Sequence, residues 1–354
     1  MENKIQKDIS LSTMTTIGLG GLAKEFIECG SEEDVLSALS YASEKDLPVH
    51  ILGGGSNTVF ADKGFDGLVI KIGNRGVSFN EKDGVTYVSA NAGESWDNIV
   101  EQCVNRGLAG FECLSGIPGL VGAAPVQNIG AYGQDVAQLI TQVNAINVSS
   151  LQKKTFSHEE CKFGYRTSRF KESISDIYAI TSVIFKTVKC DHPNVTYPEI
   201  IERLGGEASV ATLDCSAESL KQIRNVVLDI RGSKSMVSEE ASVNSKSCGS
   251  FFMNPIISKS KLDEVQSKVD EEIPNYKSED LIKIPAAWLI EKAGFPKGYR
   301  YGGVGVSSQH NLAIVNIDGT TTEVLALARD IQDAVKDKFD IQLVSEPHIV
   351  PYAK

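Results

Sequence analysis

The amino-acid sequence predicts an α+β protein of two or three domains, in which strands alternate with helices that cover them. The chain has 354 residues, more than twice the roughly 150 residues of a typical domain. Short apolar runs typical of strands recur between segments with helical periodicity. The 42% hydrophobic and 23% charged residues are the proportions of an ordinary globular protein, so we expect no extensive disorder.

The charge balance limits the classes of partner. A formal net charge of −11 and an isoelectric point near 5.1 leave no basic excess that could displace phosphate counterions. We therefore expect no nucleic-acid partner and no membrane partner, and local cations must bind any anionic substrate. Residues 1–8 lack the apolar core of a signal peptide, and no later segment provides roughly 18 uninterrupted apolar residues. These features predict a cytoplasmic protein.

The cysteines and histidines show no metal-ligand spacing. The seven cysteines are scattered and never closer than ten positions, and the five histidines form no ligand pattern. We therefore predict thiols in a reducing compartment rather than disulfides, and no metal. The cysteines are Cys29, Cys103, Cys113, Cys161, Cys190, Cys215 and Cys248.

The N-terminal part predicts a helix followed by two strands that flank a glycine-rich loop. Ser31 is a suitable N-cap for a helix over residues 31–46, with acidic residues in its first turn. Residues 48–60 then predict a strand, a tight loop and a second strand. The loop, Gly53-Gly54-Gly55-Ser56-Asn57, permits positive φ and close backbone approach, so that its N–H groups can surround a phosphate. An ordinary glycine-rich hairpin is the alternative.

The following segments continue the pattern of strands and covering helices. Residues 68–72 and 85–90 predict strands, and residues 95–106 predict a helix that Gly107 ends.

A second unusual stretch spans residues 114–133. It contains five glycines, two prolines and three alanines but almost no charge. This composition suits contact between the backbone and a flat, largely apolar cofactor, with Gln127 and Asn128 as hydrogen-bonding groups. A tightly packed, turn-rich core segment is the alternative.

Residues 161–171 gather four cations just before a strand expected over residues 177–185. We interpret Lys162 and Lys171 as solvated loop residues. Arg166, between Tyr165 and Thr167, is the candidate for a partly buried role.

The C-terminal part begins with a connection between domains. A helix over residues 217–231 ends at Gly232, and the polar stretch 233–246 predicts a boundary or mobile connection. Ser250 follows Gly249 but is not part of a G-x-S-x-G motif, so serine-hydrolase chemistry is weakly supported and a turn serine is the alternative.

The last segments alternate helices with strands. Glu346 lies near the middle of an expected final strand over residues 341–350, where an exposed-face glutamate is the usual interpretation. Residues 260–269, 286–293 and 321–339 predict helices, the last capped by Thr321 or Thr322, and residues 312–316 predict a strand.

Taken together and in this order, five motifs resemble those of the UDP-N-acetylenolpyruvoylglucosamine reductase family, flavoenzymes of peptidoglycan precursor synthesis. The resemblance covers residues 16–350. The motifs are Gly53–Asn57, Val126-Gln127-Asn128-Ile129-Gly130-Ala131-Tyr132-Gly133, Gly164-Tyr165-Arg166, Gly249-Ser250-Phe251-Phe252 and Leu343–Glu346.

The resemblance implies an FAD-binding domain of the vanillyl-alcohol-oxidase type, made of two α+β parts, and a third domain that binds substrate. The corresponding ranges are 1–72 and 73–232 for FAD and 233–340 for substrate, with 341–354 returning near the active site. By similarity, non-covalent FAD is bound by Gly53, Gly54, Gly55, Ser56, Asn57, Gly116, Gly122, Ala123, Gln127, Asn128, Gly130 and Gly133.

The resemblance also implies the reaction. NADPH passes a hydride to FAD, and reduced flavin then reduces the enolpyruvyl sugar nucleotide. Arg166 and a protonated Glu346 match the groups that stabilise the enolate-like state, and Ser250 matches the proton donor. We expect a monomer.

Further matches concern substrate binding. The chain resembles the longer type of the family, which carries a tyrosine loop, and Tyr197 is the matching tyrosine. The other matches to substrate-binding residues are Lys234, for which Lys246 is a rival, Asn254 and Gln309. Residues 309–311 depart from the family pattern, which puts the role of Gln309 in doubt.

Two other functions are compatible with parts of the sequence. One is an FAD-dependent oxidase or dehydrogenase of the same superfamily that acts on an alcohol or lactone. The other is a non-catalytic sugar-nucleotide-binding protein that keeps only the fold. Flavin bands in the visible spectrum, and NADPH consumption that depends on the enolpyruvyl sugar nucleotide, discriminate among the three.

Overall fold

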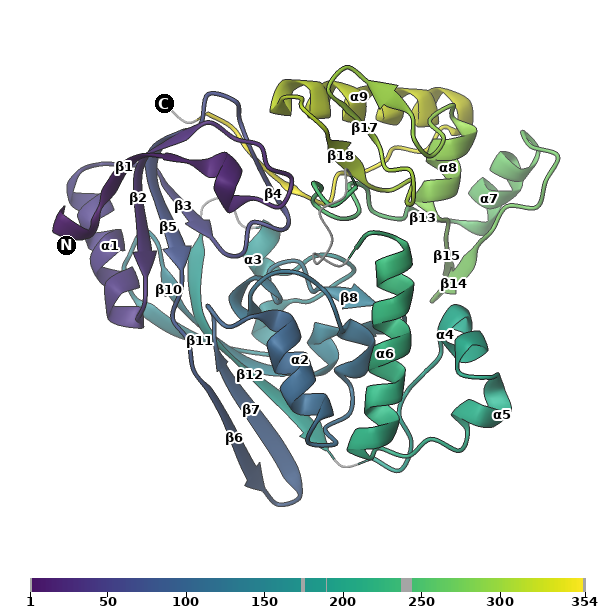
Figure 1. Cartoon of the computed structure of the whole chain (residues 1–354), viewed down its shortest axis with the longest axis horizontal. Coiled ribbons are helices and arrows are strands. Elements are labelled where there is room, and N and C mark those ends of the chain that lie inside the picture. The colour runs from purple at the N-terminus through teal and green to yellow at the C-terminus, as the bar shows by residue number, and fades with distance from the viewer. Residues whose placement is uncertain (1, 173–175, 189, 237–243, 353–354) are drawn as a thin grey trace.

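The computed structural model describes residues 2–172, 176–188, 190–236 and 244–352 (Figure 1). Its elements confirm the expected α+β class. Most predicted helices and strands are present with bounds shifted by a few residues. Part of the predicted connection 233–246, namely residues 237–243, lies outside the described residues.

The first sheet is built around the N-terminal strands and the strand that leads into the glycine-rich loop. Its order is β1-β2-β5-β3, with β1 antiparallel to β2 and both β2 and β3 parallel to β5. Helix α1 packs against β2 and β5, and the Ser31 side chain accepts a hydrogen bond from Asp34 N as the predicted cap. The elements are β1 (Gln6–Ser10), β2 (Leu22–Cys29), α1 (Glu32–Glu44), β3 (Val49–Leu52) and β5 (Phe65–Ile72).

The C-terminal segment returns to this part of the fold. The loop over residues 53–57 connects β3 to β4 (Thr58–Phe60), and β4 pairs in parallel with β19 (His348–Val350). The expected final strand over 341–350 was therefore too long: the ladder covers only its end, and Glu346 precedes it. The cause is that the preceding residues extend along another segment instead, with an isolated bridge between Phe252 and Ser345.

The second sheet is antiparallel throughout, in the order β11-β10-β12-β7-β6. Helices α2 and α6 pack together beside it, joined by a bidentate ion pair in which Arg224 donates to both carboxylate oxygens of Asp97 at 2.6 and 2.7 Å. The elements are β6 (Val77–Lys82), β7 (Val85–Asn91), α2 (Trp96–Val104), β10 (Ile140–Asn147), β11 (Lys153–Ser157), β12 (Tyr178–Val188) and α6 (Ala217–Ser233).

The stretch over residues 114–133 forms turns and short bridges rather than long elements. It contains the 3-10 turn η4 (Val121–Ala123) and strand β8 (Gly130–Ala131), which pairs with β9 (Gln134–Asp135). Its polar residues contact the first glycine-rich loop through Gln127 and, through Asn128, the turn at Gly164 that precedes the short helix α3 (Arg169–Glu172).

A separate hydrophobic core supports the C-terminal elements, which are green to yellow in Figure 1. Helix α9 packs against α8 and against the sheet β16-β17-β18. Thr320 caps α9 in a capping box with Glu323, so the expected caps Thr321 and Thr322 were wrong; their N–H groups instead donate to the carboxylate of Asp62. The elements are β13 (Ile256–Ile257), α7 (Lys259–Gln266), β14 (Tyr276–Ser278), β15 (Leu281–Lys283), α8 (Ala286–Lys292), β16 (Arg300–Tyr301), β17 (Val304–Val306), β18 (Ile314–Asn316) and α9 (Thr321–Phe339).

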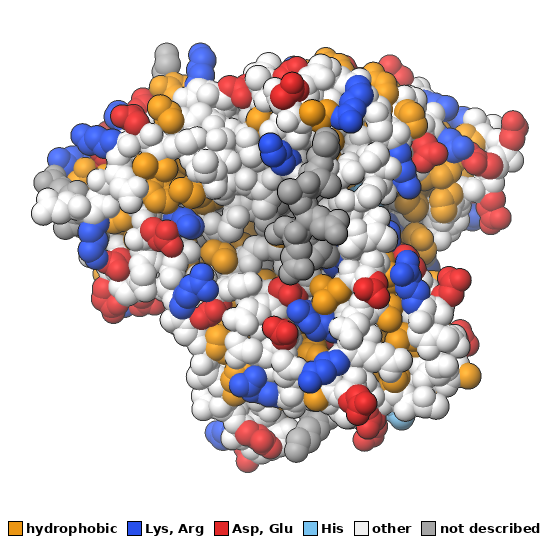
Figure 2. Space-filling model, viewed as in Figure 1, with side chains coloured by type: hydrophobic (Ala, Val, Ile, Leu, Met, Phe, Trp, Pro, Cys, Tyr) orange, Lys and Arg blue, Asp and Glu red, His pale blue; other side chains and the backbone are white. Residues whose placement is uncertain are grey.

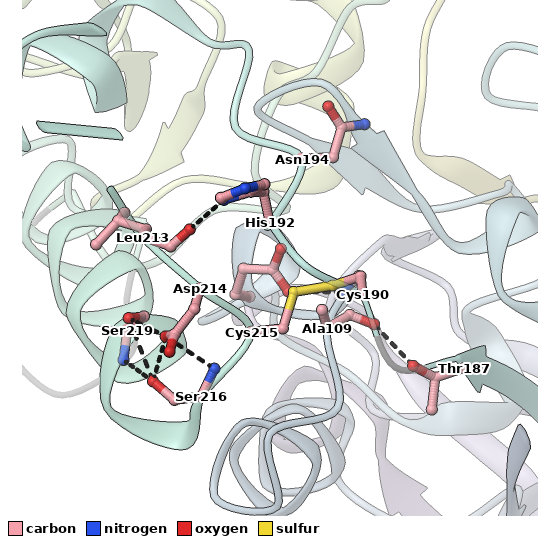
Figure 3. The surroundings of a disulfide bond; sticks show 12 residues. Ala109, Thr187, Cys190, His192, Asn194, Leu213, Asp214, Cys215, Ser216 and Ser219 are labelled. Atoms are coloured by element: carbon pink, nitrogen blue, oxygen red, sulfur yellow. Dashed lines mark hydrogen bonds between the residues drawn. A yellow bond between two sulfur atoms is a disulfide. The ribbon is translucent and has the colours of Figure 1, made fainter. Parts of the chain in front are cut away.

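A disulfide corrects the expectation that the cysteines are thiols. Cys190 and Cys215 are bonded, with a Cα–Cα distance of 5.9 Å, and enclose helices α4 (Pro198–Arg203) and α5 (Glu207–Val210) (Figure 3). Beside the bond, the His192 ring contacts the carbonyl of Leu213 at 2.9 Å, which also holds the two chain segments together. Sequence spacing could not reveal this pair because only the fold returns the chain to itself. The other five cysteines are buried thiols.

No helix among the described residues is long and apolar enough to cross a bilayer. On the face drawn in Figure 2, acidic and basic side chains are interspersed. The described His, Cys, Asp and Glu side chains form no group that could hold a metal ion.

Candidate active site

The segments that carry Ser250 and Glu346 lie side by side. Glu346 N donates to Phe251 O at 2.9 Å, and Met253 N donates to Val344 O at 2.9 Å. These bonds place the partly exposed Ser250 next to the strand-like segment that ends at Glu346. Two of the three predicted catalytic residues are thus brought together by backbone pairing.

Arg166 reaches the same place from a tight turn. Residues 164 and 167 exchange backbone hydrogen bonds, and Arg166 adopts a left-handed conformation with φ of 56°. Its guanidinium donates to Gly130 O at 2.5 Å and to Asn128 O at 3.4 Å, while Nε lies 3.3 Å from Glu346 Oε1. The guanidinium is therefore oriented by backbone carbonyls and faces the carboxyl group.

Asn128 and Gly130 support this turn from the second glycine-rich stretch. The Asn128 amide donates to Gly164 O at 3.1 Å, and its oxygen accepts from Ala137 N at 3.0 Å. A Cβ at Gly130 would lie 3.0 Å from a guanidinium nitrogen of Arg166, so the absence of a side chain leaves room for that group. In this structure both predicted cofactor residues serve to position Arg166.

Glu346 is the most deeply buried member of the group, with 13% of its side chain exposed against 22% for Arg166. Burial raises the pKa of Glu346 and outweighs the opposing effects of Arg166 and Lys171. The ion-pair geometry by itself would favour the carboxylate. Burial is the larger influence on the pKa and favours the neutral acid.

Asn57 and Gln127 connect the glycine-rich loop to Glu346. The Asn57 amide donates to the side-chain oxygen of Gln127 and, at 3.3 Å, to Glu346 O. Gln127 in turn donates to Glu346 Oε1 at 3.4 Å. The structure therefore brings together predicted residues from three distant motifs.

The other end of the loop lines a pocket of about 360 Å³. Gly53 and Gly54 form one wall, and Ile72 and Leu120 supply apolar surface. Lys71 is ion-paired at 3.1 Å with Glu28, which also lines the pocket, and Arg75 adds a positive charge. Pockets of this size with apolar walls and a few polar groups are typical of cofactor sites. Because Asn57 at the opposite end of the loop faces Glu346, the loop lies between this pocket and the reactive groups.

Close backbone packing gives the loop its shape. A Cβ at Gly55, where φ is 66°, would overlap the carbonyl oxygen of Met14, and one at Gly54 would lie 3.0 Å from Gly119. The Ser56 hydroxyl donates to Pro118 O at 3.2 Å. The residues present thus fit a dinucleotide whose phosphates lie along the loop, an arrangement that a larger residue at position 55 would prevent.

The remaining predicted cofactor residues have different surroundings. Ala123 lies beside the loop, since its Cβ would be 3.5 Å from a Cβ at Gly53. Gly122 packs against Ala92, while Gly116 N donates to the Asp97 carboxylate at 2.6 Å. A Cβ at Gly133 would lie 2.7 Å from the Thr196 hydroxyl oxygen. Contact of these residues with FAD stays a prediction.

Two predicted substrate residues are associated with the segment 190–215, which the disulfide closes: Tyr197 lies in it and Lys234 contacts it. The Tyr197 ring packs edge-on against Tyr132 with centroids 5.1 Å apart. Lys234 forms an ion pair with Glu199 of α4 at 2.9 Å. The exposed Lys246 lies beside Gly18 instead. Which of the two lysines contacts substrate stays a prediction.

The other two lie on different elements. Gln309 accepts a hydrogen bond from Ser235, one residue after Lys234. The Asn254 oxygen accepts from Ala286 N at 2.9 Å, at the start of α8, and Asn254 also hydrogen-bonds Tyr165. Asn254 thereby connects the C-terminal elements to the residue that precedes Arg166.

Comparison with known proteins identifies the family. A profile for the FAD-binding domain matches residues 23–149, and a profile for the C-terminal domain of UDP-N-acetylenolpyruvoylglucosamine reductase matches residues 241–350. A curated relative of that name from Thermobifida fusca is 40% identical and covers 99% of each chain. The chain belongs to the UDP-N-acetylenolpyruvoylglucosamine reductase family. This confirms the resemblance that the sequence motifs indicated.

Other relatives agree with this assignment. The UDP-N-acetylenolpyruvoylglucosamine reductase of Flavobacterium johnsoniae is 38% identical over 98% of this chain and its whole length. The solved structure of the Thermus caldophilus reductase matches with a TM-score of 0.66 and 23% identity over 97% of this chain and 98% of that chain, which shows the fold. Family membership confirms a flavoprotein oxidoreductase of peptidoglycan synthesis, with FAD as cofactor and the expected fold class.

Several residues of the site gave no recognisable sequence signal. Lys71 lies at the end of a predicted strand and Arg75 in the turn after it, yet both reach the pocket beside Gly53. Lys283 lies over the Tyr165 ring, 4.1 Å from its centroid. Lys171 was assigned to solvent and instead lies beside Arg166 and Glu346. No local motif marks these four residues, because only the fold brings them to the site.

Proposed function

We propose that this chain reduces UDP-N-acetylglucosamine enolpyruvate to UDP-N-acetylmuramate, with NADPH as the hydride donor to FAD. The observation that carries this proposal is the meeting of Arg166, a buried Glu346 and the Ser250 segment at one end of the Gly53–Asn57 loop. A cation, a neutral acid and a hydroxyl suit an alkene conjugated to a carboxylate, because its reduction passes through an enolate-like state.

The FAD would lie along the loop, with its phosphates at Gly53–Ser56 and its adenosine half in the pocket lined by Lys71, Arg75 and Leu120. The Arg75 cation and the apolar wall of that pocket support this orientation. When bound, FAD supplies the hydride that it has received from NADPH. The Asn57–Gln127 pair then separates the cofactor site from the Glu346 carboxyl and can hydrogen-bond on both sides.

Each catalytic side chain then has one role. Arg166 and protonated Glu346 stabilise the negative charge that develops on the substrate carboxylate as hydride adds to the terminal alkene carbon. The Ser250 hydroxyl donates a proton to the adjacent carbon, so that one hydride and one proton saturate the double bond. Burial raises the pKa of Glu346 and so favours the acid form that donates a hydrogen bond.

The substrate would lie between the C-terminal elements and the segment 190–215, which the disulfide closes. Tyr197 and Lys234, which share the α4 neighbourhood, would contact the sugar nucleotide and its phosphates; Asn254 and Gln309 would contact it from the C-terminal side. We also propose the ranges 1–72, 73–232 and 233–340 as the three domains, supported by the separate core of the C-terminal elements. The cytoplasmic location and the monomeric state stay predictions.

The decisive experiment follows the two half-reactions by flavin absorbance. We expect Ser250→Ala to be reduced by NADPH nearly as fast as the wild type, but to be reoxidised by the enolpyruvyl sugar nucleotide about 10²- to 10⁴-fold more slowly, the usual contribution of a proton donor. Glu346→Gln should likewise retain FAD. Equal losses in both half-reactions for Ser250→Ala would contradict its role, and a colourless wild-type protein would contradict the function.

The pH dependence provides a second measurement. Glu346 acts as an acid, and burial raises its pKa above the ordinary value. The reoxidation rate should therefore be high at low pH and fall as pH rises through that pKa. Glu346→Gln, which cannot ionise, should remove this alkaline decrease. A decrease that persists in Glu346→Gln would assign it to another group.

A further inference from the structure

Lys171 contacts the backbone of both members of the Arg166–Glu346 pair. Its ammonium group donates to the main-chain oxygen of Arg166 at 3.1 Å and makes a longer contact of 3.5 Å with the main-chain oxygen of Glu346. The side chain is partly buried, so the expectation that it is a solvated loop lysine was wrong. Lys162, nine positions earlier in the same cationic segment, is exposed as expected.

The two carbonyl groups belong to short segments that local hydrogen bonds hold separately: residues 164 and 167 bond each other, while Glu346 N donates to Phe251 O and Glu346 O accepts from Asn57. Arg166 is in the left-handed region with φ of 56°, a conformation that is unfavourable for a non-glycine residue. Glu346 lies between the isolated bridge at Ser345 and the start of β19, outside any continuous ladder. A single ammonium group that contacts both carbonyls connects the turn to the C-terminal segment.

Charges around the pair are consistent with this location. Burial lowers the pKa of Lys171, while the nearby Glu346 opposes that effect. In the other direction, Lys171 and Arg166 both lower the pKa of Glu346 against the larger effect of burial. Lys171 also lowers the pKa of His348, and Lys283 faces Arg166 from β15.

We propose that Lys171 is a positioning residue for the reduction: by contacting both main-chain oxygens it holds the Arg166 guanidinium and the Glu346 carboxyl at their 3.3 Å separation. The proposal rests on the functions proposed for those two residues. Lys171 is directed at the backbone and acts through the pair. Without it, the turn and the C-terminal segment can move apart, and a displacement of about 1 Å at a reacting centre lowers rates by about 10²-fold.

The test uses the flavin-loaded protein and three variants. Lys171→Met keeps an unbranched side chain without the charge, Lys171→Arg keeps a cation that can donate to two oxygens, and Lys162→Met removes a cation from the exposed part of the same segment. For Lys171→Met we expect reoxidation by the enolpyruvyl sugar nucleotide to slow by about 10- to 100-fold, while reduction by NADPH and the FAD content stay nearly unchanged. Lys171→Arg should restore most of the rate, and Lys162→Met should behave as the wild type.

The pH profile separates positioning from simple structural support. Loss of a cation near Glu346 raises its pKa, so the alkaline decrease in reoxidation should move to higher pH in Lys171→Met and stay in place in Lys171→Arg. An unchanged rate and profile in Lys171→Met would overturn the inference. Loss of FAD or equal slowing of both half-reactions would also overturn it, since the role would then be structural. Failure of the wild type to be reoxidised by the enolpyruvyl sugar nucleotide would instead overturn the proposed function.

Discussion

Replacing Gly55 with alanine should destabilise the glycine-rich loop over residues 53–57, for which we propose FAD binding. Two separate effects act at this position. The residue has φ of 66°, and a new Cβ would overlap the main-chain oxygen of Met14. Two positions after Met14, Thr16 N donates to Gly55 O at 3.2 Å. Neither of these two backbone segments can move without breaking the contact between them.

The magnitude follows from adding the two effects. The left-handed conformation costs alanine about 1–2 kcal/mol, and overpacking costs about 1–3 kcal/mol more. We therefore expect Gly55→Ala to lower the free energy of unfolding by about 2–5 kcal/mol, a large part of the roughly 5–15 kcal/mol of a typical protein. Because the loop N–H groups move with the backbone, the dissociation constant for FAD should rise by at least about tenfold.

Two other glycines supply matched controls. Gly84, in the hairpin between β6 and β7, has φ of 75° but no atom within 4 Å of a new Cβ, so Gly84→Ala isolates the conformational effect. Gly53 lacks a positive φ, and its Cβ would make an ordinary 3.5 Å contact with Ala123, so Gly53→Ala should scarcely change the stability of the apoprotein. Urea unfolding and titration with FAD measure both quantities. Equal destabilisation by Gly55→Ala and Gly84→Ala, or unchanged FAD affinity in Gly55→Ala, would refute the reasoning.

Two further predictions concern stability. The Cys190–Cys215 bond joins positions 25 apart, and the loop-entropy model assigns such a bond about 3.5 kcal/mol; the double variant Cys190→Ser/Cys215→Ser should therefore unfold at lower urea concentration than the wild type, and coincident curves without reductant would contradict the bond. Burial lowers the pKa of His50 from 6.5 to about 3, with His348 stacked on it, so the folded state holds a neutral ring that the unfolded state protonates. The contribution of His50 to the free energy of unfolding is complete above pH 6.5 and falls by about 1.4 kcal/mol for each pH unit toward pH 3. His50→Phe should therefore reduce the loss of stability in acid. An unchanged slope would assign that loss to other groups.

Local sequence patterns were sufficient to predict the elements whose determinants lie close together in the chain. Ser31 caps the helix that was expected after it, and the three glycines between two apolar runs form the loop between β3 and β4. These predictions succeeded because N-caps, periodicity and positive φ depend on residues within a few positions of one another. The motif order also indicated the family, because order along the chain is a property of the sequence.

Long-range pairing decided what local patterns could not. Residue 346 was assigned to a strand because its neighbours are apolar, but the structure pairs its N–H with Phe251 and leaves the ladder to His348–Val350. The disulfide and the position of Lys171 were missed for the same reason. A solvated and a buried lysine have identical local sequence requirements, and only the packing of α3 against the C-terminal segment distinguishes them.

The sequence by itself therefore determined the α+β class and the glycine-rich loop, and it identified Arg166, Ser250 and Glu346 as candidates. Only the tertiary structure decided how they meet. Gln127 and Glu346 hydrogen-bond although they are 219 positions apart. Burial of Glu346, which favours its acid form, arises from segments contributed by the whole length of the chain. Desolvation depends on all atoms around a group, so no local pattern could have predicted it.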